Sequence, residues 1–567
     1  MATGERFSDL ALEIFKKRYY VKNEQGTPIE TTPQQVFKRV SAALAGDNYG
    51  MRSRFLSVMT NRQFLPAGRT LANAGGPTSL IASCVVLPIE DSLCGERSIF
   101  GTLHDAIRLQ QVGSGIGFDF SPLRPRGTPA ARTRGVASGP CSFILVYDTA
   151  FGVVKQQGRN GANLGTLDAG HPDVLEFVSL KSREGTLRNF NLSVSVRDDF
   201  MRQAVGQASG YERDVLWAIA RGAWGNGEPG LLFSDTINRF HNPLPGLGRI
   251  FATNPCGEQA LHAYDACNLG SINVAAFVEP GGQSADFRLL KEVVYTAVDM
   301  LDAVIDRLRF PVLAVEQTVR GNRRIGLGVM GVAEYLFKRR LRYGTREAVD
   351  EVGKLMRWIT SCAQERSGQL AALHGNFPNY SFSVYAKDGV LRRNASVTCC
   401  PPTGSTSLLY DVTGGIEPAF RLSYERDICG RLCRIKNPTV VEMLQRHEEE
   451  FSEGTVTRLL AEIEARGRVE GSGLFCPPDY LVTAEDVSPL QHVDMQAAFQ
   501  RACENTVSKT VNLPQSASVQ DVLDIYRYAW ESGVAGITIY RNNSRKVQVL
   551  YDIQDAPGLA RCPSCVL

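Results

Sequence analysis

The decisive stretch of this chain is Asn-Pro-Cys-Gly-Glu at residues 254–258. A second motif, Ala-Cys-Asn-Leu-Gly-Ser, follows it at residues 266–271. Proline and glycine favour a tight turn over a helix or a central strand. On such a turn the amide of Asn254, the thiol of Cys256 and the carboxylate of Glu258 can converge on one small substrate. Taken alone, the pentapeptide more often marks a buried cysteine in a turn, because free cysteine usually behaves as a small hydrophobe.

The size and charge of the chain exclude few functions, but its lack of long apolar segments indicates where in the cell it is located. It has 567 residues, a mass of 62.1 kDa and a formal net charge of +3, and it contains no basic tract with interleaved aromatic residues. The first ten residues are polar and charged, and no run approaches the ~18 apolar residues that cross a bilayer. We therefore expect a cytoplasmic protein that binds neither nucleic acid nor a membrane.

Fourteen cysteines are too sparse in a chain of this length for a disulfide scaffold, so most should be thiols in a reducing cytosol. The pair Cys562-x-x-Cys565 lies in a tail with two prolines, residues 546–567. A dithiol near a mobile end suits thiol–disulfide exchange. A structural zinc site is the lesser interpretation, because it needs four ligands and there is no second Cys-x-x-Cys.

Along the chain, helical patterns alternate with short apolar runs, which predicts an α/β fold. Residues 1–80 form a helical N-terminal region, in which Thr32 and Gln35 make a capping box. Residues 81–89 are a buried strand carrying Cys84. The alternating glycines of residues 113–117 mark a close approach of backbone or ligand to a strand. Further helices are expected at residues 143–154, 285–308 and 350–374.

Two glycine-bearing segments have more than one interpretation. Gly326-Leu-Gly-Val-Met-Gly331 matches a dinucleotide fingerprint, but the basic stretch before it is not an apolar strand, and close packing explains its glycines equally well. The turn at residues 401–407 is rich in hydroxyls. Its Thr403, Gly404, Ser405, Thr406 and Ser407 are either a solvated turn or a cradle for phosphate.

Taken together, these segments resemble the ribonucleotide reductases, specifically the adenosylcobalamin-dependent class. The matching pieces run in family order from about residue 11 to 545: FLPAGRTLANAG, ASCVVLPIEDSL, GSGIGFDFSPLRPRG, NPCGE with ACNLGSIN, RRIGLGVMG, PPTGSTS, VSKTVNLP and GITIYRNNSR. The resemblance implies a ten-stranded α/β barrel of two five-stranded halves over residues 81–545, with Cys256 on a finger loop inside it.

The resemblance also implies a role for each residue of the catalytic motif. Cys256 would be the transient thiyl radical that removes the ribose 3′-hydrogen. Glu258 would be the general base on the 3′-hydroxyl, and Asn254 would hydrogen-bond the sugar hydroxyls. Cys84 and Cys267 would be the dithiol that supplies the reducing electrons and closes to a disulfide.

Further residues match positions that bind ligands in the family. Ser83, Gly115 and the turn of residues 403–407 correspond to the region that holds substrate phosphates. Cys562 and Cys565 would re-reduce the buried disulfide and then be reduced by a thioredoxin-like partner. Asp91 and Arg124 match contacts to a deoxynucleoside triphosphate effector at the interface of a homodimer.

The loop at residues 155–165 matches the family's specificity loop, which relays the identity of the effector to the substrate base. Here Gln157, Arg159 and Asn160 replace a stretch that is usually richer in glycine and arginine, so base-reading contacts differ. The region before the reductase motifs is too short for an ATP-binding cone, which predicts that dATP does not shut the enzyme off.

The source of the radical follows from what the sequence lacks. The tail has no glycyl-radical motif, and Tyr540 stands alone where reductases with a metal-containing radical subunit have two consecutive tyrosines. That leaves adenosylcobalamin as the cofactor. No Asp-x-His-x-x-Gly surrounds any histidine, so we expect that no histidine replaces the cobalamin's own base beneath the cobalt, and that the chain binds no metal besides the cobalt of cobalamin. The alternatives are the large subunit of a metal-radical reductase, a nicotinamide-dependent dehydrogenase and a catalytically silent relative.

Overall fold

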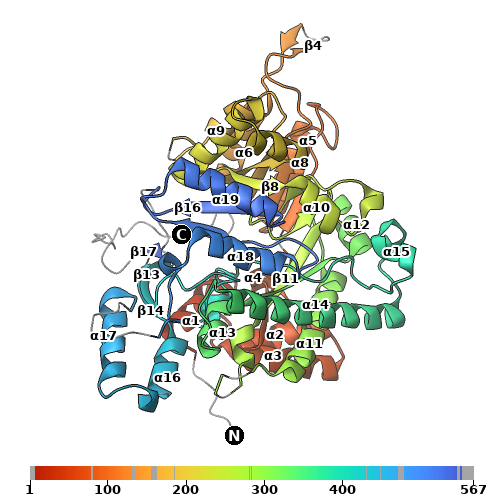
Figure 1. Cartoon of the computed structure of the whole chain (residues 1–567). Coiled ribbons are helices and arrows are strands. Elements are labelled where there is room, and N and C mark those ends of the chain that lie inside the picture. Colours follow the sequence, from red (N-terminus) through yellow and green to blue (C-terminus); the bar gives the residue numbers. More distant parts are fainter. Residues whose placement is uncertain are drawn as a thin grey trace.

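The structure is a computed structural model of the chain (Figure 1). It describes residues 7–77, 81–82, 84–130, 134–154, 162–183, 185–279, 281–282, 284–428, 431–446, 448–469, 478–545 and 550–551. Some residues for which a binding or redox role is predicted lie outside these ranges, namely Ser83, Gln157, Arg159, Asn160, Cys562 and Cys565. Among the helices described, none is both long and apolar enough to cross a membrane.

The N-terminal region is helical. It comprises α1 (Asp9–Ile14), the π-helical turn η1 (Phe15–Tyr19), α2 (Pro33–Ala45), α3 (Tyr49–Thr60) and α4 (Gly68–Asn73). Helix α2 begins with the predicted capping box, in which the side chains of Thr32 and Gln35 each accept a hydrogen bond from the other residue's backbone N–H. Helices α2 and α3 pack against α11 (Phe287–Arg307) in the lower part of Figure 1.

Five parallel strands form one half of the main sheet. In spatial order they are β2 (Cys84–Leu87), β3 (Gly115–Asp119), β6 (Asn163–Asp168), β7 (Phe190–Val196) and β8 (Gly230–Phe233). Parallel neighbours need crossover connections. Helices of these crossovers gather in the upper part of Figure 1, among them α5 (Ile99–Gln111), α6 (Pro140–Val153), α8 (Asp198–Gly206) and α9 (Tyr211–Asn226).

The second half contains two parallel pairs: β11 (Ala266–Asn273) with β12 (Ile325–Met330), and β15 (Thr510–Leu513) with β16 (Gly536–Arg541). Residues 396–400 connect these pairs, because Thr398 bridges to Leu327 and Cys400 bridges to Val507. The halves meet antiparallel along both edges, β11 on β2 and β16 on β8. This arrangement agrees with the predicted α/β fold of two five-stranded halves.

Other elements surround this sheet. The short strand β1 (Phe64–Pro66) extends it on β11. The remaining longer helices are α12 (Leu313–Asn322), α13 (Val332–Lys338), α14 (Arg346–His374), α18 (Pro489–Gln500) and α19 (Val519–Glu531). A small hairpin of β4 (Pro129–Ala130) and β5 (Gly135–Val136) lies between β3 and α6 in the chain.

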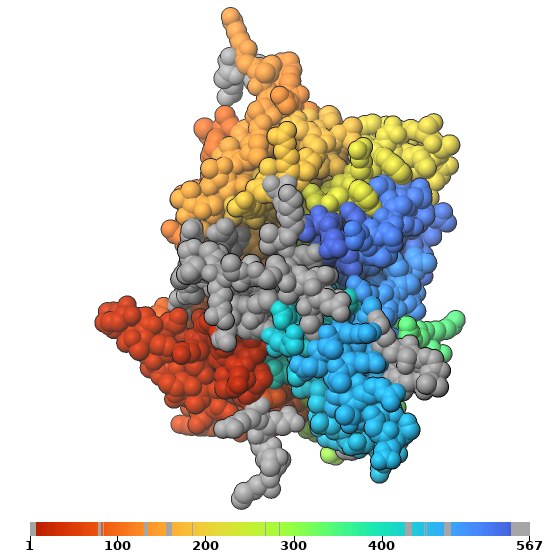
Figure 2. Space-filling view, turned by 90° about the vertical axis from the view of Figure 1, so that its left-hand side faces the viewer, coloured from red at the N-terminus to blue at the C-terminus, as the bar shows by residue number. Residues whose placement is uncertain are grey.

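A smaller core lies apart from the main one. Helices α16 (Pro438–Arg446) and α17 (Thr455–Arg466) bury Leu444, Leu459 and neighbouring apolar side chains there. Figure 2 shows this part of the chain, in light blue, as a lobe at the lower right of the surface. These two helices therefore form a helical lobe with apolar packing of its own.

Candidate active site

A finger loop, residues 252–261, carries the Asn-Pro-Cys-Gly-Glu motif. Its arms are the antiparallel strands β9 (Ala252–Thr253) and β10 (Ala260–Leu261). At its tip the Gly257 N–H donates to the Asn254 carbonyl at 3.0 Å, and Gly257 has a φ of 80°. Proline as second residue and glycine as fourth residue suit such a turn. The predicted tight turn is present.

The alternating glycines of β3 lie directly against the finger loop. A Cβ atom on Gly117 would lie 1.9 Å from the Thr253 carbonyl oxygen, and one on Gly115 would lie 3.3 Å from Pro255 Cγ. A side chain on Gly117 would therefore displace the loop, whereas one on Gly115 would only crowd it. The close approach predicted from the glycine spacing is therefore an approach of backbone.

Residues far along the chain hold the loop from its other side. The Asn505 side chain accepts from the Ala260 N–H at 2.9 Å and donates to Gln259 Oε1 at 2.8 Å. The Thr506 hydroxyl donates to the Gly257 carbonyl at 2.7 Å. Neither residue belongs to a motif that the sequence alone singles out. The only signal in the sequence was that this pair of polar residues directly precedes the family-like stretch VSKTVNLP, residues 507–514.

The three side chains of the motif differ in exposure. Asn254 and Glu258 are buried, whereas Cys256 is exposed at the tip. Burial raises the pKa of Glu258 to about 7, and hydrogen bonds from its own backbone N–H and from the Asn254 side chain offset only part of this effect. Its Oε2 atom has no hydrogen-bond partner among the described residues. The site therefore holds a carboxyl group poised to exchange a proton near neutral pH.

The two predicted redox cysteines lie directly opposite each other. Cys84 at the start of β2 pairs in register with Cys267 of β11, and these strands are antiparallel. Opposed residues of an antiparallel pair have Cα atoms roughly 4.5–5.5 Å apart, a separation that allows a disulfide. The Asn254 amide lies 3.4 Å from Cys84 Sγ, which connects this pair to the finger loop.

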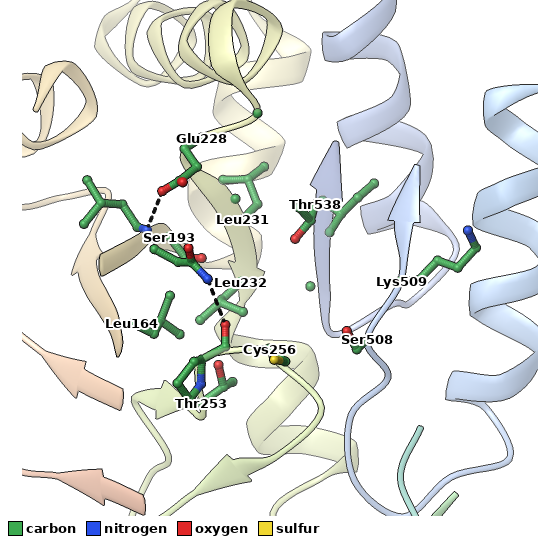
Figure 3. A pocket seen from close by; sticks show the side chains of 18 of the residues that line it. Leu164, Ser193, Glu228, Leu231, Leu232, Thr253, Cys256, Ser508, Lys509 and Thr538 are labelled. Carbon is green, nitrogen blue, oxygen red and sulfur yellow. Dashed lines mark hydrogen bonds between the residues drawn. The ribbon is translucent and has the colours of Figure 1, made fainter. Parts of the chain in front are cut away.

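Cys256 faces an open cavity of about 160 Å³ between the finger loop, strands β7, β8 and β16, and residues 507–509 (Figure 3). Polar groups on its wall come from Asn191, Ser193, Glu228 and Thr538. The Asn191 amide is 3.5 Å from the Pro255 carbonyl, and Glu228 accepts a hydrogen bond from the backbone of β7. A molecule in this cavity would therefore meet the exposed thiol and several hydrogen-bonding groups.

Two cations hold Glu228 at the edge of this cavity. Lys181 Nζ lies 2.7 Å and Arg545 Nη2 lies 3.0 Å from the same carboxylate oxygen. Glu228 is 8% exposed, so these contacts compensate a carboxylate that is largely removed from water. No motif in the sequence indicated this cluster, since its members are far apart in the chain.

The hydroxyl-rich turn of residues 401–407 lies outside the cavity that Cys256 faces. Thr403 adopts a φ of 47° and accepts a hydrogen bond from the Gly415 N–H at 2.7 Å. The preceding Cys400 donates its N–H to the carbonyl of Thr506, the residue that also holds the finger loop. The turn and the loop thus share one anchor.

Two predicted effector contacts come together. Arg124 Nε lies 2.6 Å from Asp91 Oδ2 on a partly exposed surface, although 33 residues separate them in the chain. By contrast, the glycines of the dinucleotide-like motif do not form a phosphate loop. Gly326 and Gly328 lie inside the buried strand β12. In a dinucleotide-binding fingerprint, the glycines lie instead in the turn between a strand and a helix. Close packing is therefore the correct interpretation of that motif.

Comparisons with known proteins agree with this geometry. The family model described as "Ribonucleotide reductase, barrel domain" matches residues 82–212, 207–392 and 385–540, and "Ribonucleotide reductase, all-alpha domain" matches residues 5–79. The chain belongs to the ribonucleotide reductase family. Its fold class and the resemblance predicted from the motifs are thereby confirmed.

Relatives within the family are named for vitamin B12. The chain is 42% identical, over 98% of its length and 81% of the relative, to the vitamin B12-dependent ribonucleoside-diphosphate reductase of Mycobacterium tuberculosis strain H37Rv. It is 38% identical, over 88% of its length and 66% of the relative, to that of Thermoplasma acidophilum. The solved class Id α subunit of Actinobacillus ureae, 20% identical, shares the fold with a TM-score of 0.79 over 95% of this chain and 97% of its own.

Proposed function

We propose that this reductase converts ribonucleoside di- or triphosphates to 2′-deoxyribonucleotides with a thiyl radical on Cys256, and that adenosylcobalamin starts the reaction. The observation that carries the proposal is the contrast within the finger loop. Cys256 is exposed to a cavity, while Glu258 beside it is buried with its pKa raised to about 7. The names of the most similar relatives support the choice of cofactor.

The residues of the site can divide the chemistry among themselves. The Cys256 radical removes the ribose 3′-hydrogen, and Glu258 accepts the 3′-hydroxyl proton while the 2′-hydroxyl leaves as water. A base with a pKa near the working pH is effective in this role. Cys84 and Cys267 provide two electrons and become a disulfide, and Cys256 then returns its hydrogen atom to the 3′ carbon.

The cavity beside Cys256 fits the cofactor's nucleoside end. Adenosylcobalamin supplies, when bound, a carbon radical that can take a hydrogen atom from a thiol. The amide of Asn191 and the hydroxyls of Ser193 and Thr538 offer the donors and acceptors that a ribonucleoside requires. Gly230 and Gly536 let strands β8 and β16 approach each other closely at this wall, since a Cβ at either would lie 3.2 Å or less from atoms of the other strand.

The remaining roles belong to the same proposal. Asp91 and Arg124 would contact a deoxynucleoside triphosphate effector in a homodimer, and the loop containing Gln157, Arg159 and Asn160 would relay its identity. The tail dithiol Cys562 and Cys565 would pass electrons from a thioredoxin-like reductant to Cys84 and Cys267. These roles are supported by the match of individual residues to the family's pattern.

Anaerobic reduction of CDP and CTP tests the proposal. Purified protein would be assayed with adenosylcobalamin and dithiothreitol, with and without dTTP or dATP. We expect deoxynucleotide from the wild type and from Cys94→Ala, whose exposed thiol lies outside the site, and none from Cys256→Ala. Product that appears only after a metal-radical subunit is added would instead identify the chain as the large subunit of that other class.

A further inference from the structure

The N-terminal helical region holds the hydroxyl-rich turn from outside the barrel. The buried Tyr410 hydroxyl donates to the Met59 carbonyl at 2.7 Å, and the Ser8 hydroxyl donates to Asp411 Oδ1 at 2.5 Å. Helix α1 also packs against the short helix η5 (Ser407–Leu409) that continues the turn. The position of the turn therefore depends on two parts of the chain that are about four hundred residues apart.

One basic side chain of this region reaches the turn itself. Arg18 Nη1 donates to Ser405 Oγ at 2.7 Å across an exposed surface. Arg18 lies on η1, a π-helical turn, and such turns occur frequently at functional sites. The neighbouring Lys17 is instead paired with Glu13 at 2.9 Å. The side chain of Arg18 thus reaches the turn, whereas the side chain of Lys17 pairs with the helix that precedes it.

The turn has an inner and an outer end. Its inner end follows Cys400, which bonds to Thr506 and so lies beside the finger loop. Its outer end carries Ser405, where Arg18 arrives. If the ribose lies against Cys256, the phosphates extend outward along the turn, and the phosphate farthest from the sugar comes closest to Arg18.

We propose that Arg18 is a substrate-binding residue that contacts the distal phosphate of a ribonucleotide held by residues 403–407. This inference rests on the proposed function. A guanidinium presents several N–H donors in a planar fork that matches phosphate oxygens, so Arg18 can contact a phosphate next to its bond to Ser405. Ser405 can donate its own hydroxyl proton to the phosphate while it accepts from Arg18. The N-terminal region then completes the active site and selects nucleotides with at least two phosphates.

Substitution at adjacent positions tests this assignment. We expect Arg18→Gln to raise the KM for CDP about ten-fold and to leave kcat nearly unchanged, because a charge-assisted hydrogen bond in the bound state is lost. Arg18→Lys should recover part of the affinity. Lys17→Gln, which removes a charge one residue away, should have no effect on either constant.

Equilibrium binding, measured by calorimetry without cofactor, gives a second readout. Arg18→Gln should weaken binding of CDP and leave binding of cytidine unchanged. Equal weakening of both ligands, equal effects of the Arg18 and Lys17 substitutions, or a fall in kcat at constant KM would overturn the assignment. Absence of turnover by the wild type, with phosphate-dependent CDP binding intact, would contradict the cobalamin reaction and leave the role of Arg18 standing.

Discussion

Strands β3 and β12 carry the same spacing of glycines in the two halves of the barrel, but the glycines admit different neighbours. In β3, Gly115 and Gly117 make room for the tip and one arm of the finger loop. In β12, a Cβ on Gly326 would lie 2.6 Å from Gln259 Nε2, and one on Gly328 would lie 2.4 Å from Pro401 Cδ. Both strands therefore lack side chains at the positions where another segment crosses the barrel interior.

The difference shows how the site divides its tasks. In the first half, the glycines of β3 leave room for the turn that carries Cys256, so this half determines where the Cys256 thiol lies. The glycines of β12 leave room for Gln259 and for the start of the hydroxyl-rich turn, so the second half determines how the loop is held and where the turn proposed to bind phosphates lies. Substitutions in β3 should therefore affect kcat most, and substitutions in β12 should affect stability and KM.

The largest effect is expected for Gly117→Ala. Its Cβ would lie 1.9 Å from the Thr253 carbonyl, so the finger loop must shift, and a misplacement of about 1 Å can cost roughly 100-fold in rate. Gly115→Ala is the matched variant, because its contact with Pro255 is 3.3 Å and needs only a slight adjustment. Anaerobic turnover measures both. Equal activity of the two variants would contradict the assignment of β3 to thiol placement.

The next largest effect on kcat/KM is expected for Glu258, on the buried side of the finger loop. With a pKa raised to about 7, Glu258 carries its proton below that pH and cannot act as the base. We expect kcat/KM to fall about ten-fold per pH unit below pH 7 and to level off above it. Glu258→Gln should lower kcat/KM by up to about 100-fold and abolish its dependence on pH. A flat profile for the wild type would exclude this carboxylate as the base.

A smaller effect on rate is expected for Gly328→Ala in β12. Overpacking against Pro401 should lower the free energy of unfolding by about 1–3 kcal/mol and raise the KM for CDP several-fold, with a lesser change in kcat. Urea unfolding and initial rates measure these quantities. Gly225→Ala is the control for stability, since a Cβ there meets no atom within 4 Å on helix α9. A kcat defect as large as that of Gly117→Ala would remove the distinction between the strands.

The smallest effect should come from Thr506→Val, which removes the hydroxyl that holds the Gly257 carbonyl. One such hydrogen bond contributes about 1 kcal/mol, so we expect kcat to fall a few-fold at an almost unchanged KM. Thr510→Val is the control, because the Thr510 hydroxyl makes no hydrogen bond among the described residues. An unchanged kcat for Thr506→Val would show that Asn505 alone holds the loop.

Local chemistry made several features predictable from the sequence. The Pro-Gly turn of the finger loop, the capping box of α2 and the strand carrying Cys84 each depend on residues close together in the chain. Such features follow from backbone preferences that do not require the rest of the fold. The order of the motifs, matched to a family, extended this local information to the fold class.

Tertiary structure decided what these features do together. Asn505 reaches Ala260 across 245 residues, and Cys84 meets Cys267 only because β2 and β11 pair along one edge of the sheet. The raised pKa of Glu258 follows from burial, which no residue spacing encodes. Likewise, the glycines of β12 fitted both a nucleotide loop and a packed strand until their neighbours were known. Sequence by itself determined the reactive groups and their turn, whereas the closing of distant segments around them determined their exposure, pairing and protonation.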